Sequence, residues 1–93
     1  MIESFRCRET ASVFRRQYSR RLPRDIQVSA LRKLRMLHRS RTLRDLTVPP
    51  ANRLEKLSGD REGQYSIRIN EQWRICFEWC EGNARNVEIV DYH

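Results

Sequence analysis

The sequence predicts an α+β fold in which two N-terminal helices pack on a small antiparallel sheet. Apolar residues recur at helical spacing in the first half of the chain and alternate with polar residues in the second half. Pro49 and Pro50 separate the halves, because each proline restricts the residue before it and disfavours a helix there. The 93 residues are expected to form one domain, 1–93, which buries ~65% of its unfolded surface.

The first elements follow from short patterns near the N-terminus. Residues 2–5 alternate between apolar and polar side chains and predict a short first strand. Thr10 is placed to cap a helix in which Ala11, Phe14 and Tyr18 recur at positions i, i+3 and i+7. Cations gather where that helix should end, which suits the negative end of a helix dipole: Arg15, Arg16, Arg20 and Arg21.

A second helix is predicted from Pro23, a residue that suits a first helical turn, to about His38. Its apolar stripe consists of Ala30, Leu31, Leu34 and Leu37. Two amphipathic helices in tandem predict a helical hairpin. Leu43 and Leu46 then predict one further short helical turn, after which the two prolines end helical structure.

The second half of the chain reads as an antiparallel meander. A short strand containing Leu54 is expected before Gly59, and two strands of strict alternation follow at residues 65–69 and 73–80. Turns are expected at 70–72 and 81–83, and the last strand carries Val87 and Ile89 on its apolar face. The large aromatic residues are assigned to the core rather than to base stacking: Trp73, Phe77 and Trp79.

The positive charge is concentrated in the helical half. Residues 1–50 hold 13 Lys and Arg against 4 Asp and Glu, a net of +9, whereas residues 51–93 hold 6 against 8, a net of −2. Arginine supplies 17 of the 19 cations, and its planar fork suits bidentate contact with phosphate. An acidic partner is therefore expected, either nucleic acid or an acidic protein segment. The alternative is an ordinary solvated surface.

The cysteines and the hydropathy limit other classes of function. Cys7, Cys76 and Cys80 have no CxxC spacing, and a zinc site would need more ligands than the chain can group together. They are interpreted as reduced thiols of a cytoplasmic protein. No apolar run approaches 18 residues, so neither a signal peptide nor a membrane span is expected. No metal or cofactor is expected.

The chain ends on Asp91, Tyr92 and His93, directly after a strand-like alternation. If this basic protein performs phosphoester chemistry near neutral pH, His93 is the obvious proton carrier, because only histidine has an unperturbed pKa in that range. The alternative is a frayed terminus.

Two arginines are expected on the side of the sheet away from the core. In strand alternation Arg74 points away from the face of Ile75, and Arg68 points away from the face of Ile67. If the two strands pair as a hairpin, both guanidinium groups lie on the non-core face. The alternative is that they serve only in salt bridges, with partners such as Glu55 and Glu78.

Several motifs together resemble HigB toxins of the RelE/ParE superfamily of bacterial toxin–antitoxin systems. The motifs lie at residues 53–55, 59–61, 65–70, 72–77 and 87–93. The opening residues 1–5 and the stretch 43–46 before the two prolines fit as well, so the resemblance spans the whole chain. It implies an α+β fold and metal-free cleavage of messenger RNA in the ribosomal A site. It also implies neutralisation by a HigA-type helix-turn-helix antitoxin, with the pair binding its own operator DNA.

Cleavage by the 2′-hydroxyl needs a base, an acid and cations around the phosphate. Under the resemblance His93 is the acid or base, and Tyr92 donates a hydrogen bond, stacks on a base or holds the RNA backbone. Asp91 orients one of these two residues, and Arg74 is the bidentate phosphate clamp. Weaker candidates for binding the RNA backbone are Arg53, Lys56, Arg61 and Arg68.

The chain departs from some HigB relatives, which carry a histidine and a lysine in the strand before the Gly59-Asp60 turn. Here Glu55 and Ser58 stand in those places, and Lys56 would point to the opposite face from residue 55. The second proton carrier is therefore Glu55, Lys56 or an activation supplied by the ribosome, which would predict little cleavage of naked RNA.

Two further hypotheses belong to other classes of function. A ParE-like toxin would inhibit gyrase by binding, without cutting RNA. A plain basic nucleic-acid-binding module would bind with a steep salt dependence and no turnover. The arginine-rich helices could contact ribosomal RNA or an acidic antitoxin segment, and ribosomal RNA is favoured for part of that surface.

Overall fold

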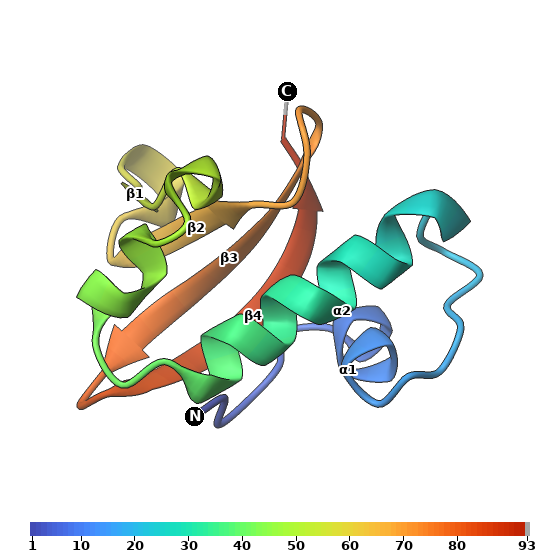
Figure 1. Ribbon diagram of the computed structural model, residues 1–93, viewed down its shortest axis with the longest axis horizontal. Helices are drawn as coiled ribbons and strands as arrows, with labels where there is room; N and C mark the ends of the chain where they lie inside the picture. Colours follow the sequence, from blue (N-terminus) through green and yellow to red (C-terminus); the bar gives the residue numbers. More distant parts are fainter. Residues whose placement is uncertain (93) are drawn as a thin grey trace.

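A four-stranded antiparallel sheet, in the order β1-β2-β3-β4, is covered on one face by two helices (Figure 1). The computed structural model describes residues 1–92, so the predictions for His93 lie outside the described residues. The helices are α1 (Arg8–Phe14) and α2 (Arg24–Arg39). The strands are β1 (Glu55–Lys56), β2 (Gln64–Arg68), β3 (Trp73–Cys80) and β4 (Asn83–Asp91). The predicted α+β fold is confirmed.

The core lies between α2 and the sheet. Ile75 of β3 pairs with Ile67 of β2 on one side and with Ile89 of β4 on the other. These isoleucines form a row across three strands, on the face of the sheet that packs against the helices. Leu34 and Leu37 of α2 pack against this row and are fully buried. Phe77 is fully buried, as predicted, while Trp73 and Trp79 are only partly buried at the edge of the core.

The prediction of a first strand over residues 2–5 is only partly right. Ile2 and Phe5 each form an isolated bridge, to Ala84 and Val87, and both bridges are parallel to β4. Asn86 has a left-handed backbone (φ 52°), which interrupts the edge of β4 between the two bridges. The segment therefore pairs at two points instead of forming a continuous strand.

The first helix is shorter than predicted and is capped differently. Cys7 is its N-cap, and the helix ends at Phe14 because Arg16 adopts a left-handed backbone (φ 62°). Thr10 lies inside the helix and is fully buried, where its hydroxyl accepts a hydrogen bond of 2.9 Å from the Ile89 backbone N–H. The threonine thus joins α1 to β4 instead of capping the helix.

The second helix agrees with the prediction to within one residue at each end. The short turn predicted around Leu43 and Leu46 is the 3-10 helix η1 (Leu43–Thr47). Helical structure does not end at the prolines, because a second 3-10 turn, η2 (Pro50–Asn52), begins at Pro50. Proline is tolerated at the first position of a helical turn, where its missing N–H is not needed.

A buried polar joint ties η2 to α2. Lys33 of α2 donates a hydrogen bond of 2.5 Å to the Asn52 side-chain oxygen, and the Asn52 amide donates to the Leu46 carbonyl. Burial lowers the pKa of Lys33, and the neighbouring Arg32 lowers this pKa further. The joint fixes the chain immediately before Arg53, whose left-handed backbone (φ 45°) turns its carbonyl toward the open face of the sheet.

Candidate nucleic-acid interface and active site

Arg74 lies on the face of the sheet that the helices do not cover. Its side chain is only 8% exposed, and its guanidinium group has partners on several sides. Nε donates to the Ser66 hydroxyl at 2.8 Å, and one terminal nitrogen donates to the Arg53 carbonyl at 2.6 Å. The other terminal nitrogen lies 3.3 Å from a carboxylate oxygen of Glu55. Strands β1, β2 and β3 therefore all contribute to holding this one cation.

Tyr92 covers the face of the same guanidinium group. Its ring centroid is 5.3 Å from the central carbon of Arg74, a distance at which a cation–π attraction operates. The Tyr92 backbone N–H donates to the Gln72 carbonyl at 2.6 Å, which fixes the chain just after β4. Tyr92 is 40% exposed, so the contact with Arg74 does not enclose it.

These contacts modify the expectation for Arg74. A bidentate phosphate clamp requires two adjacent N–H groups that are free, whereas here the fork already engages the Arg53 carbonyl and the Glu55 carboxylate. A phosphate would have to share the guanidinium with Glu55 or displace that side chain. Arg74 is thus both a cation of the site and the group that positions Glu55 and Tyr92.

Two shallow pockets open on either side of Tyr92. One, of about 310 Å³, is lined by Arg53, Arg68, Asn70, Glu71, Arg74 and Tyr92. The other, of about 250 Å³, is lined by Glu55, Lys56, Leu57, Ser58, Asp60, Arg61 and Tyr92. Each of the four residues predicted to contact the RNA backbone lines one of the two pockets: Arg53 and Arg68 line the first, and Lys56 and Arg61 line the second. The structure therefore brings the three arginines to the same surface as Arg74 and Tyr92, while Lys56 lines the rim of the second pocket.

The weaker candidates differ in how freely they could bind a phosphate. Lys56 is exposed and pairs with Tyr65, while Glu55 pairs with Ser66, so the two side chains point to opposite faces as expected. Arg68 is partly exposed and forms a loose ion pair of 3.9 Å with Glu71.

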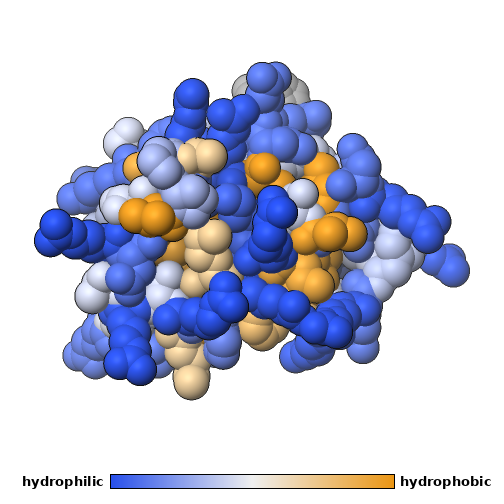
Figure 2. All heavy atoms as spheres, viewed as in Figure 1, coloured by the Kyte–Doolittle hydropathy of each residue, from blue (hydrophilic) through white to orange (hydrophobic). Residues whose placement is uncertain are grey.

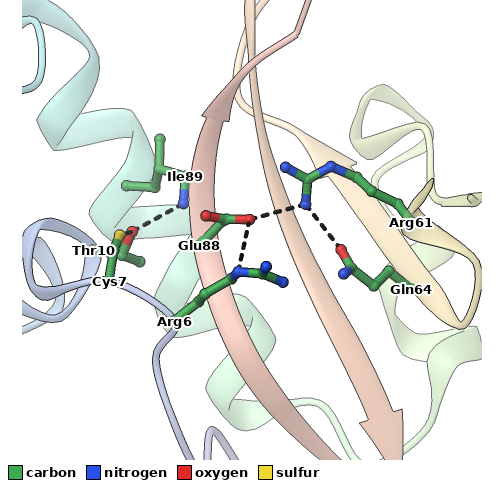
Figure 3. A network of polar contacts seen from close by, with 7 residues as sticks. All are labelled: Arg6, Cys7, Thr10, Arg61, Gln64, Glu88 and Ile89. Atoms are coloured by element: carbon green, nitrogen blue, oxygen red, sulfur yellow. Dashed lines mark hydrogen bonds and ion pairs between the residues drawn. The ribbon is translucent and has the colours of Figure 1, made fainter.

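Arg61 is held in a structural network on the open face (Figure 3). Its guanidinium donates to a carboxylate oxygen of Glu88 at 2.9 Å and to the Gln64 side-chain oxygen at 3.1 Å. Arg6 lies 3.8 Å from the same Glu88 oxygen. The hydrogen bond to Glu88 raises the pKa of Arg61. Since Glu88 already balances its charge, Arg61 contributes less free positive potential than Arg53.

The remaining predicted residues lie at the end of β4. Asp91 pairs with Trp73 in the sheet, and its carboxylate accepts a hydrogen bond of 3.1 Å from the Gln72 side-chain amide. That Asp91 orients Tyr92 or His93 stays a prediction. His93 follows Tyr92 directly in the sequence and lies outside the described residues. The other histidine, His38, is structural, because its Nδ1 accepts a hydrogen bond from the Ile2 backbone N–H.

Sequence reasoning missed Ser66. It named Glu55 both as a possible salt-bridge partner of Arg68 and Arg74 and as one of three alternatives for the second proton carrier, and the ion pair with Arg74 is present. The signal was present in the alternation, because residues 66 and 74 both lie on the non-core faces of adjacent strands. The register confirms this, since Ser66 pairs with Cys76 and with Glu55. The length and position of the short β1 strand had to be known before Glu55 could be placed against Arg74.

Neither a metal cluster nor a membrane helix is found in the part of the chain that the structure describes. Among residues 1–92 no group of three or more His, Cys, Asp or Glu side chains could hold a metal ion. Over the same residues, no helix is both long and apolar enough to cross a membrane.

Solved structures share this fold. The YoeB–YefM complex from Staphylococcus aureus contains a chain that superposes with a TM-score of 0.62 at 16% identity, covering 100% of this chain and 98% of that one. YafQ from Escherichia coli superposes with a TM-score of 0.57 at 11% identity, covering 98% and 93%. At such identities the similarity shows the fold alone.

The sequence identifies the family. Residues 3–93 match the model of the RelE-like toxin of the type II toxin–antitoxin system HigB. Toxin HigB-1 of Vibrio cholerae is 42% identical over 67 residues, covering 72% of this chain and 70% of that protein. Endoribonuclease HigB of Proteus vulgaris is 44% identical over 41 residues, covering 44% and 45%. The chain belongs to the HigB-like family of RelE-like toxins.

Proposed function

We propose that this protein is an endoribonuclease toxin that cleaves messenger RNA in the A site of the ribosome. The 2′-hydroxyl attacks the adjacent phosphorus, the bond from phosphorus to the 5′-oxygen breaks, and the products are a 2′,3′-cyclic phosphate and a 5′-hydroxyl. A base takes the proton of the 2′-hydroxyl, and an acid gives one to the departing 5′-oxygen. The Endoribonuclease HigB relative from Proteus vulgaris supports the activity.

One observation carries the proposal: Arg74, Glu55 and Tyr92 converge at a point where two pockets meet. A cation, a carboxylate and an aromatic hydroxyl come from β3, β1 and the end of β4, and arginines line the pocket beside them. Such a set can neutralise a crowded phosphate, move a proton and contact a base. The buried guanidinium group alone would account for Glu55 as its partner, but not for the ring of Tyr92 and the arginines that gather beside this pair.

The positions of the described groups support the following roles. Glu55 is half exposed at the rim of the pocket and is the base that takes the 2′-hydroxyl proton. Arg74 stabilises the negative charge that grows on the phosphate and holds Glu55 in place. Tyr92 packs against the nucleotide on the exposed side of its ring. His93 is the acid for the 5′-oxygen, because histidine alone has an unperturbed pKa near neutral pH and His93 is next to Tyr92 in the sequence.

The ribosome supplies the remaining activation. The site is shallow, and Arg74 shares its charge with Glu55, so isolated RNA would be held weakly. Fixing the RNA on the ribosome converts a rare encounter into an arrangement close to reaction geometry. We therefore expect rapid cleavage on translating ribosomes and little cleavage of naked RNA.

The proposed partner outside the ribosome is a HigA-type helix-turn-helix antitoxin that neutralises the toxin in the cytoplasm. The chain's membership of a type II toxin–antitoxin family supports such a partner. A chain of a solved YoeB–YefM toxin–antitoxin complex shares the fold. Operator DNA would be bound only by the toxin–antitoxin pair.

Induced expression in cells tests the activity directly. We expect growth arrest, with new RNA ends inside codons of translated messages and with cyclic phosphates at the upstream ends. The variant His93→Ala should abolish both, whereas Arg85→Ala, which removes a surface arginine paired with Glu3, should arrest growth like the wild type. Intact messages accompanied by DNA damage would contradict the proposal and favour gyrase inhibition.

A further inference from the structure

A buried lysine on α2 is not used in the proposed reaction. Hydrophilic side chains cover most of the face shown in Figure 2, and the arginines of α2 are all exposed, but Lys33 of the same helix is only 7% exposed. Taking an ammonium group out of water costs free energy, and a hydrogen bond to a neutral group returns only part of it. An apolar side chain would avoid that cost, so packing alone does not explain a lysine here.

The partner of Lys33 is a side chain that uses both ends of its amide. Lys33 Nζ donates to Asn52 Oδ1 at 2.5 Å, and Asn52 Nδ2 donates to the Leu46 carbonyl at 3.1 Å. Asn52 is fully buried. A leucine at this position could make neither contact, and an aspartate could not donate to the carbonyl. Asn52 thus attaches the η2 turn both to α2 and to η1.

The segment that follows Asn52 carries two partners of Arg74. Arg53 is the next residue, and its carbonyl accepts a hydrogen bond of 2.6 Å from the guanidinium group. Glu55 lies 3.3 Å from the same group. In β1, which carries Glu55, only two residues pair with β2, so the sheet supports this segment over a short length. Its position against Arg74 therefore depends on how Asn52 holds the chain before it.

We propose that Lys33 and Asn52 are positioning residues of the active site, a proposal that rests on the proposed function for the reaction itself. Neither residue lines the two shallow pockets of the site, so neither would contact the RNA. Together they fix the left-handed turn at Arg53, and this turn sets where its carbonyl and the carboxylate of Glu55 meet Arg74. A charged donor suits this task, because its hydrogen bonds are shorter and stronger than neutral ones.

Lys33→Met tests the proposal, because methionine has a similar length but cannot donate to Asn52. A misplacement of about 1 Å in a catalytic group can slow a reaction about 100-fold. We therefore expect single-turnover cleavage on purified ribosomes to fall about 10- to 100-fold, with ribosome binding unchanged. Asn52→Asp keeps an acceptor for Lys33 but loses the donor to the Leu46 carbonyl, and it should slow cleavage as well.

The matched control is Gln27→Met on the same helix. The Gln27 side-chain amide also holds a loop, since it donates to the Ser19 carbonyl at 2.7 Å and to the Leu22 carbonyl at 3.0 Å. That loop joins α1 to α2 and does not lead to Arg74. Gln27→Met should lower the melting temperature but cleave like the wild type. A joint at Lys33 that served only stability would behave in the same way.

Hydrogen exchange of the Arg74 Nε–H, followed by NMR, gives a second measurement that needs no RNA. This group donates to the Ser66 hydroxyl at 2.8 Å and is buried, so its exchange should be slow in the wild type and in Gln27→Met. In Lys33→Met the exchange should be faster, because the Arg53 carbonyl and Glu55 no longer hold the guanidinium group in place.

The two measurements separate this proposal from the proposed function. If the wild type cuts no RNA but Lys33→Met still speeds the exchange at Arg74, the positioning stands and the ribonuclease proposal falls. If the wild type cuts RNA while folded Lys33→Met and Asn52→Asp cleave as fast as Gln27→Met, the positioning proposal is overturned. Unchanged exchange at Arg74 in both variants would overturn it too.

Discussion

The side chain of Arg74 is 8% exposed, and a guanidinium group buried to that extent requires partners for its charge and its N–H groups. Ser66, the Arg53 carbonyl and Glu55 provide them. Among these, only Glu55 combines a charge with substantial exposure, at 48% of its side chain. At the scale of single residues, the ion pair between Arg74 and Glu55 thus has two functions. It balances the charge of the buried guanidinium group, and it holds the proposed base in place.

Replacing Glu55 by glutamine should slow cleavage without unfolding the protein. The amide oxygen can still accept a hydrogen bond from Arg74, but the amide cannot take the proton of the 2′-hydroxyl. Loss of a general base typically slows a reaction about 10²- to 10⁴-fold. The measurement is the cleavage rate on programmed ribosomes, with the melting temperature as a check of folding.

A matched control for this substitution is Glu71→Gln, because Glu71 lines the neighbouring pocket and pairs loosely with Arg68 at 3.9 Å. That variant should cleave within a few-fold of the wild type. Equal rates for Glu55→Gln and the wild type would rule out Glu55 as the base and leave the ribosome or Lys56 as the source of activation.

Among the elements, β4 has the most connections, since it pairs with β3, carries the bridges to residues 2–5 and receives the side chain of Thr10 from α1. The chain that follows it carries Tyr92 to the site. Because β4 is held along its length by these contacts, the position of Tyr92 depends on the packing of the helices on the other face.

Thr10→Val tests the joint between α1 and β4. Valine matches the shape of threonine but cannot accept the Ile89 backbone N–H, which would be left buried without a partner. Such a loss costs about 1–3 kcal/mol of unfolding free energy. Denaturant unfolding measures this value, and Ser12→Ala on the same helix should change it by less than about 0.5 kcal/mol. A neutral Thr10→Val would show that the hydrogen bond does not couple the two elements.

Across the whole molecule, periodicity predicted the class of the fold, the second helix and the meander. It failed where contacts distant in sequence decide the structure. The end of α1 depends on the left-handed Arg16, and the true partner of Thr10 is 79 residues away. Neither fact leaves a local signal in the sequence.

The sequence predicted most of the residues of the candidate site but few of the contacts between them. Alternation placed Arg68 and Arg74 on the same face, and their direct pairing across β2 and β3 confirms it. The sequence did not show that other groups already occupy the N–H groups of Arg74 that a phosphate would use. The Arg53 carbonyl accepts one of them only because of the left-handed turn after η2. The distribution of charge likewise predicts an acidic partner but not the surface on which it would bind.

The central claim is that Arg74 stabilises the reacting phosphate on the open face of the sheet. The most direct test is the single-turnover rate of messenger cleavage on purified ribosomes for Arg74→Lys, which keeps the charge but loses the planar fork. We predict a fall of about 10²- to 10³-fold, the range for losing one donor to a transition state, with ribosome binding unchanged. A rate equal to that of the wild type and of Arg85→Ala would contradict the account.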